Sequence, residues 1–210
     1  GTYSVGPTGN YTSIGAALTA ISGGITGPVI LELEGTYLSS VESFPIVFPS
    51  NACIGPVNSL TIRPSASATN LSITSSNVTG TINFNGATYV TIDGRPGGTG
   101  TTSQLTVSNT NAGTSYAVQF TGDARFNTIK YTTVTSRNTS AASGTIVFTG
   151  GLVFGNDLNT IDNCSILDGS STPLNAIYSA GTSTSVDNSN NTISNCNIAN
   201  YFGAATASNG

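Results

Sequence analysis

Short apolar runs, each ending on an isoleucine or leucine, recur along the chain from residue 28 onwards. They are bounded by turn-forming residues, a pattern that favours buried strands over helices. The residues that mark them are Leu31, Ile62, Ile92, Ile129, Ile161 and Ile193. Successive members are 31, 30, 37, 32 and 32 residues apart. We therefore predict one strand at each position, and a glycine-rich turn insertion at residues 94–100 in the longest step.

Two further strands are predicted in each later interval. One precedes the marker isoleucine, at residues 82–84, 118–120, 146–148 and 176–178, and another follows it, at residues 105–107, 132–134 and 164–166. Three strands in a coil of about 30 residues give a triangular cross-section. Six such coils would rise roughly 29 Å, at about 4.8 Å per coil.

A repeated tripeptide supports this periodicity. Asn-Thr-Ile begins at Asn127, Asn159 and Asn191, with the same spacing of 32 residues, and a β-branched residue follows seven positions later at Val134, Ile166 and Ile198. A fixed period of this length in a β-rich chain is typical of a solenoid, in which each repeat packs only on its neighbours. Equivalent residues should then stack from coil to coil.

The recurring asparagines fit sharp turns between strands, because asparagine tolerates left-handed backbone angles. Stacked amides can also hydrogen-bond to one another along the axis. We expect Asn127, Asn159 and Asn191 to form one ladder and Asn163 and Asn195 a second. The alternative is a row of amides that binds a ligand.

One segment near the start has a helical period. Ile14, Ala17, Leu18 and Ile21 are spaced for one face of a helix near residues 12–22, with Thr12 or Ser13 as N-cap and Gly23-Gly24 as the stop. The helix would cover the open apolar end of the first coil. We expect a single domain over residues 1–210, with an N-terminal cap at 1–27 and coils at 28–210.

Composition limits the partners of the chain. Only 7% of residues are charged, and the net charge is −4 from 5 basic and 9 acidic residues. No basic patch is available for nucleic acid, and no run approaches the roughly 18 apolar residues of a membrane span. The chain has no methionine and begins at Gly1. We therefore expect a processed or trimmed segment. The few charges and abundant Thr, Ser and Asn favour an exported bacterial protein, secreted or on the cell surface. The sequence near Ala204-Ala205-Thr206 has no recognisable cap, which predicts more coils or domains beyond Gly210.

Cysteine usage leaves three alternatives open. Cys164 and Cys196 lie one repeat apart and should stack, either as small apolar side chains in equivalent core positions, as a disulfide, or as part of a metal site. The chain has no histidine and no Cys-x-x-Cys pair, so a zinc site has little support. We expect no cofactor.

These features resemble the right-handed parallel β-helix superfamily of pectin-lyase-like proteins. The resemblance rests on the opening YSVGPTGNYTSIGAALTAIS and on the coils NTIDNCSILDG and NTISNCNIAN. The opening is also similar to that of large secreted, adhesin-like surface proteins of Bacteroidetes, exported through a C-terminal (type IX) sorting signal that would lie beyond Gly210. The resemblance implies an all-β solenoid of about six three-stranded coils with a capping helix. It leaves function open, since the superfamily includes lyases, hydrolases, esterases and binding proteins.

The enzymes of that superfamily group carboxylates with histidine or arginine in one cleft. Without histidine, the hydrolase pattern fails. The best remaining catalytic cluster is Asp93 with Arg95 and Asp123, joined by Arg125 if the coils stack these groups along one edge. The simpler interpretation is a set of turn aspartates with solvated arginines.

Other side chains suggest surfaces rather than chemistry. Tyr89, Tyr116, Tyr131, Tyr178 and Tyr201 lie on different coils and form either a glycan-binding row or ordinary packing contacts. We expect Phe84, Phe120, Phe148 and Phe154 in the core. A threonine row at Thr128, Thr160 and Thr192 resembles the flat face of ice-binding solenoids, although β propensity alone explains it. Lys130 and Asp162 should form an exposed ion pair between coils.

The sequence therefore predicts a non-catalytic β-helical segment of a secreted or cell-surface protein, adhesin-like or structural, that binds glycan or another surface polymer. A polysaccharide lyase or other carbohydrate-active enzyme is the first alternative, and an ice-binding solenoid is the second.

Overall fold

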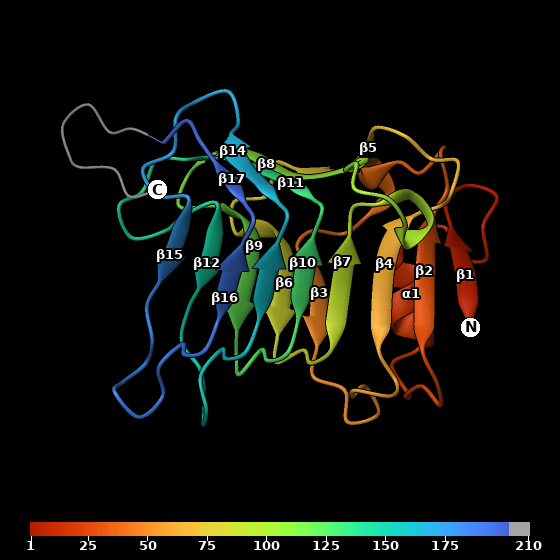
Figure 1. The fold of residues 1–210 in the computed structure, drawn as a ribbon, viewed down its shortest axis with the longest axis horizontal. Helices are drawn as coiled ribbons and strands as arrows, with labels where there is room; N and C mark the ends of the chain where they lie inside the picture. Colours follow the sequence, from red (N-terminus) through yellow and green to blue (C-terminus); the bar gives the residue numbers. More distant parts are fainter. Residues whose placement is uncertain (202–210) are drawn as a thin grey trace.

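The computed structural model describes residues 1–201 as three parallel sheets wound around one core (Figure 1). All strand pairings within the three sheets are parallel. The chain forms a right-handed parallel β-helix of about six turns. The predicted fold class is confirmed. Sheet A contains, in spatial order, β1 (Thr2–Val5), β2 (Val29–Leu33), β4 (Leu60–Pro64), β7 (Val90–Asp93), β10 (Thr128–Lys130), β13 (Thr160–Asp162) and β16 (Thr192–Ser194).

The other two sheets complete each coil, and a full coil runs from sheet A to sheet C to sheet B. Sheet B contains β3 (Ile46–Pro49), β6 (Gly80–Asn85), β9 (Tyr116–Thr121), β12 (Ile146–Phe148) and β15 (Ile177–Ser179). Sheet C contains β5 (Leu71–Ser75), β8 (Leu105–Gly113), β11 (Thr133–Asn138), β14 (Ser165–Asp168) and β17 (Asn197–Ile198). In the first coil a short 3₁₀ helix, η1 (Ser39–Val41), packs on β5.

The marker isoleucines set the register of sheet A. Leu31, Ile62, Ile92, Ile129, Ile161 and Ile193 pair successively across its strands. The first five are buried, and Ile193, on the last described strand of the sheet, is 45% exposed. A shift of one residue would turn this apolar column outward, so its burial fixes the register.

A column of phenylalanines fills the core behind sheet B. Phe48, Phe84, Phe120 and Phe148 are buried, and successive ring centroids lie 5.3, 4.8 and 4.6 Å apart. Such pairs contribute about 0.5–1.5 kcal/mol each beyond the burial of their area. The prediction was wrong for Phe154, which is 57% exposed because it lies in the turn after β12 rather than on a strand.

Helix α1 (Ile14–Ala20) is shorter than the predicted segment 12–22 and packs on β3. Its N-cap is Ser13, whose Oγ accepts a hydrogen bond from the Ala16 amide. The Glu42 carboxylate accepts from the next free amides, those of Ile14 and Gly15, at 2.6 and 3.0 Å. These bonds satisfy amides that a helix N-terminus leaves without intrahelical partners.

The glycine-rich step forms a compact turn, as predicted. It contains a 3₁₀ helix, η2 (Pro96–Gly98), which packs on β4. Within residues 1–201, no helix combines the length and apolarity that a membrane crossing requires.

Candidate functional site

The charged side chains of sheet A form a column along the carboxyl ends of its strands. The register aligns Glu32 with Arg63, and Asp93 with Lys130, which in turn is aligned with Asp162. Arg63 Nη2 lies 2.6 Å from Glu32 Oε1, and Lys130 Nζ lies 3.4 Å from Asp93 Oδ2. The predicted Lys130–Asp162 ion pair is wrong, because Lys130 turns to the carboxylate of the preceding coil.

Asp93 is the buried carboxylate of this column. It is 3% exposed, and Arg95 donates to both its oxygens, from Nε at 2.9 Å and from Nη2 at 2.8 Å. Burial alone would raise the pKa of Asp93, but the bonds from Arg95 and the charge of Lys130 outweigh it and hold that pKa below its usual value. Arg95 in turn covers the Tyr131 ring at 4.3 Å.

Asp123 lies at the other end of the sheet A strands, in the turn between β9 and β10. Its carboxylate accepts hydrogen bonds from four consecutive amides, those of Leu152, Val153, Phe154 and Gly155, at 2.7 to 3.2 Å. Partial burial opposes ionisation, but these amides lower the pKa of Asp123 below its usual value. Asp123 therefore secures a turn of the next coil.

The predicted catalytic cluster is not assembled. Asp93 ends β7 and Arg95 follows it, whereas Asp123 and Arg125 precede β10, so the two pairs occupy opposite corners of the coil. The prediction required the coils to stack the two pairs along one edge, but strands β8 and β9 lie between the pairs. No three Asp, Glu, Cys or His side chains within residues 1–201 gather as a metal ligand set.

The asparagine column at the start of the sheet A strands is continuous, and Asn191, its last member, is half-buried. The backbone amide and Nδ2 of Asn127 both donate to Asn159 Oδ1, at 3.0 Å, and Asn159 donates in the same way to Asn191 Oδ1, at 2.9 and 3.1 Å. The Nδ2 of Asn159 also donates to the Ala124 carbonyl. Each amide thus ties the turn of one coil to the next, and Asn127 and Asn159 are 0% and 1% exposed.

The second expected ladder is wrong. Asn163 and Asn195 both adopt left-handed backbone angles, but their Nδ2 groups donate to Asp162 rather than to each other. A ladder that was not predicted joins Asn156 and Asn188, where Asn156 Nδ2 donates to Asn188 Oδ1 at 2.8 Å. Asn156 and Asn188 are 32 residues apart, like the members of the first ladder, so this spacing could have predicted their contact.

Cys164 and Cys196 stack in the core as free thiols. The hydrogen bond between the two thiols, together with burial, raises the pKa of Cys164. The same contact lowers the pKa of Cys196.

The five tyrosines do not form a row. Tyr116 is buried, Tyr131 lies under Arg95, Tyr89 stacks on Phe126 at 4.9 Å, Tyr178 is half-buried in sheet B, and the Tyr201 hydroxyl donates to Thr145 and Leu167.

The threonine row is longer than predicted, because Thr61 and Thr91 precede Thr128, Thr160 and Thr192 in register.

An open groove of about 500 Å³ lies along sheet B. It is lined by Pro45, Val78, Thr79, Asn83, Thr114, Tyr116 and Gln119. None of these side chains is charged. Tyr116 packs flat over Gly80, where a Cβ would overlap the ring. Burial raises the pKa of Tyr116 to about 12, so its hydroxyl stays neutral.

The groove has an unused acceptor. Asn83 Oδ1 is buried and has no hydrogen-bond partner, which costs about 1–3 kcal/mol in a folded protein. On the next strand, Gln119 aligns with Asn83 and donates to Thr149 at 3.2 Å. Amides on successive coils therefore offer donors and acceptors along the groove.

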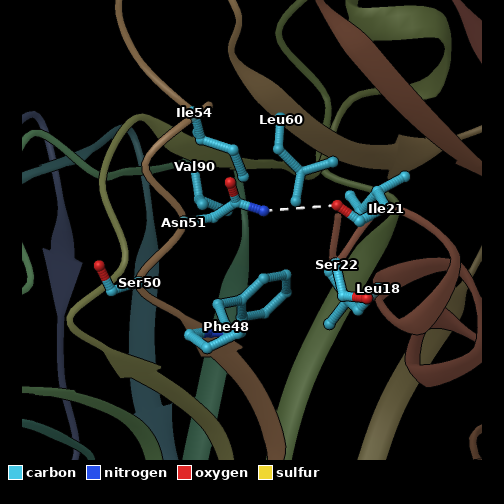
Figure 2. Close-up of a pocket in the computed structure, with 10 residues that line it drawn as sticks. Leu18, Ile21, Ser22, Phe48, Ser50, Asn51, Ile54, Leu60 and Val90 are labelled. Atoms are coloured by element: carbon cyan, nitrogen blue, oxygen red, sulfur yellow. Dashed lines mark hydrogen bonds between the residues drawn. The ribbon is translucent and has the colours of Figure 1, made fainter. Parts of the chain in front are cut away.

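A second hollow is small and only partly enclosed. Leu18, Ile21 and Ser22 of the helical segment face Phe48, Leu60 and Val90 across a cavity of about 60 Å³, bridged by a bond from Asn51 to the Ile21 carbonyl (Figure 2). It holds a few water molecules at most, so the sheet B groove is the better candidate.

The chain matches no described protein family, and no curated protein or solved structure is significantly similar to it.

Proposed function

We propose that this chain is a non-catalytic β-helical segment of a secreted or cell-surface bacterial protein, adhesin-like or structural, that binds a neutral glycan in the sheet B groove. The lining of the groove carries the proposal, because it is uncharged and combines the amide residues Asn83 and Gln119, on adjacent coils, with the ring of Tyr116. Sugar hydroxyls both donate and accept, so amides and hydroxyls suit them better than charges do.

The remaining features support export and display. Charged residues are few, and those of sheet A pair with one another rather than line the groove. The low charge and the Thr-, Ser- and Asn-rich surface support an extracellular protein. We extend the proposal to type IX export and to further coils or domains beyond Gly210, on the resemblance of the opening noted from the sequence alone.

The test is retention of the purified chain on a panel of neutral and acidic polysaccharides, with product analysis. We expect retention on a neutral polymer with no unsaturated or shortened products. Asn83→Ala and Gln119→Ala should each weaken binding about tenfold, and Asn190→Ala, an exposed amide outside the groove, should not. Asn83→Ala removes an unsatisfied acceptor, so its stability should stay level or rise, which separates loss of binding from loss of fold.

Depolymerisation by the wild-type chain would instead support the carbohydrate-active enzyme. Retention that Asn83→Ala and Gln119→Ala leave unchanged would remove the groove from the proposal.

An ice-binding face is the second candidate, favoured by the five aligned threonines of sheet A. The neighbouring outward column is charged rather than threonine, so the flat hydroxyl surface is one residue wide. A measurement of thermal hysteresis with the wild-type chain tests this candidate, and a value of zero would exclude ice binding.

A further inference from the structure

Sheet B passes into sheet A through the turns that follow β9 and β12 (Figure 1), and these turns carry several exposed apolar side chains. Leu152, Val153 and Phe154 are 77%, 63% and 57% exposed, and Phe126 and Leu158 are 37% and 38% exposed. Single exposed apolar residues are common, but a contiguous group of them marks an interaction surface. We name these five residues, with Arg125, the 152–154 edge.

The conformation of this turn is fixed by the protein. The Asp123 carboxylate accepts the amides of residues 152–155, so these backbone donors point toward the preceding coil. Gly155, at φ 96°, allows the chain to close tightly there, since a Cβ would overlap the Asp187 carbonyl. With the donors turned inward, the side chains of Leu152, Val153 and Phe154 are presented to solvent in a preformed arrangement.

A guanidinium lies among these apolar groups without an anionic partner. Arg125 Cζ is 5.2 Å from the Phe126 ring centre and 4.8 Å from that of Phe154. The ion pairs within residues 1–201 involve Arg63, Arg95 and Lys130, and Arg125 Nε is buried without a hydrogen-bond partner. An arginine held between rings keeps its planar fork oriented for a carboxylate.

We propose that the 152–154 edge binds an acidic peptide segment, whose carboxylate pairs with Arg125 and whose adjacent apolar side chain packs on Leu152, Val153 and Phe154. The aliphatic groups suit a peptide better than a glycan. The ring faces that a sugar would need are partly covered, because Phe126 lies between Tyr89 and Arg125. A single cation on a chain of net charge −4 does not suit nucleic acid or an anionic membrane.

This surface is separate from the groove, since it shares no residue with the groove lining. The proposal therefore stands or falls independently of glycan binding.

The test is a titration of the ¹⁵N-labelled full chain with N-acetyl-L-leucine, followed by amide chemical shifts. The probe has one carboxylate and one apolar side chain, and N-acetyl-L-leucine amide is its neutral match. We expect saturable shifts at Arg125 and residues 152–155, with a Kd of about 1 mM for so small a ligand. The neutral amide should bind at least about tenfold more weakly.

Two variants locate the interaction. Arg125→Gln should weaken binding at least about tenfold, while Arg137→Gln should not change it. Arg137 is a matched control, because its Nε is also buried without a partner and it has no carboxylate partner within residues 1–201. The double variant Leu152→Ser/Val153→Ser keeps Arg125 and the Asp123 contacts, and should also weaken binding.

Three results would overturn the proposal: no saturable shift at this edge, equal binding of the acid and the amide, or equal effects of the Arg125 and Arg137 variants. Tighter binding of D-glucuronate at the same amides would assign the edge to an acidic glycan instead. If Arg125→Gln disturbs the turn, the Leu152→Ser/Val153→Ser variant and the comparison of the acid with the amide in the wild-type chain still decide the outcome.

Discussion

The two ends of the sheet A strands stack polar groups in different ways. Where the strands begin, one residue type repeats, and where they end, opposite charges alternate. The first column is Asn127, Asn159 and Asn191, and the second includes Glu32, Arg63, Asp93, Lys130 and Asp162. An amide carries both donor and acceptor, so identical amides can bond along the axis, whereas a carboxylate only accepts and needs a donor of another kind beside it.

The asparagine column is also more deeply buried than the charged column. Asn127 and Asn159 are essentially inaccessible, while the side chains of Glu32 and Arg63 are 23% and 21% exposed. Asp93 is the exception among the charges and is nearly buried. Because water can replace a lost partner only where it has access, changes in the amide column should cost more than changes in the charge column.

The largest effect is expected from Asn159→Asp, which breaks the self-complementarity of the amide column. An ionised carboxyl at this position cannot donate to Asn191 Oδ1 or to the Ala124 carbonyl, and it places an uncompensated charge in the core. We expect the free energy of unfolding to fall by about 3–5 kcal/mol, measured by urea denaturation at pH 7.

Asn190→Asp is the matched control, since Asn190 is exposed and lies next to the column. Its backbone angle, φ 55°, suits Asp as well as Asn. It should change stability by less than about 0.5 kcal/mol. Equal losses in the two variants would mean that the amide ladder contributes no more than a surface amide.

Asp93→Asn tests the buried member of the charge column. Arg95 and Lys130 lose their common anion, but both cations reach solvent, so we expect a loss of about 1–3 kcal/mol. Asp162→Asn is the comparison variant, because Asp162 is the next acidic residue of the column. Its hydrogen-bond partners are the neutral side chains of Ser194, Asn163 and Asn195. This variant should cost less than about 1 kcal/mol, and a reversed order would show that burial does not govern this column.

The contrast between the columns also explains which features the sequence could predict. A self-complementary residue can repeat without change, so the stacking of Asn127, Asn159 and Asn191 is visible as a period in the sequence itself. The marker isoleucines are visible for the same reason, since an apolar side chain packs on its own kind. The fold could therefore be predicted from the sequence.

Groups that need a different partner leave no such period. The pairing of Lys130 with Asp93 rather than Asp162 depends on side-chain direction between two carboxylates in register. Asp123 bonds to backbone amides of the following coil, which carry no sequence signal. The groove around Asn83 and the turn that exposes Phe154 depend on how loops of unequal length fold over the sheets, so the candidate sites could not be predicted.

Lowering the pH should reduce the free energy of unfolding, because Asp93 and Asp123 stabilise the fold only when they are ionised. Each pKa is lowered in the folded chain below the unfolded value of about 3.9. The stability that they contribute is therefore fully present above about pH 4 and is lost as the pH falls through the folded pKa. The urea midpoint at pH 6, 4 and 3 should decline less in Asp93→Asn or Asp123→Asn than in the wild type. A decline of equal size in all three proteins would contradict this assignment.

The smallest effect is expected from Glu32→Gln, at the exposed part of the charge column. Arg63 donates from Nε and Nη2 to Glu32 Oε1 at 2.9 and 2.6 Å, and a glutamine oxygen can accept both bonds, so only the charge is removed. We expect a loss below about 1 kcal/mol at low salt that disappears near 1 M NaCl, because salt screens exposed pairs. A cycle with Arg63→Gln isolates the pair energy. A coupling well above 1 kcal/mol, or one that salt leaves unchanged, would place this pair with the buried columns and remove the difference between the two ends of the strands.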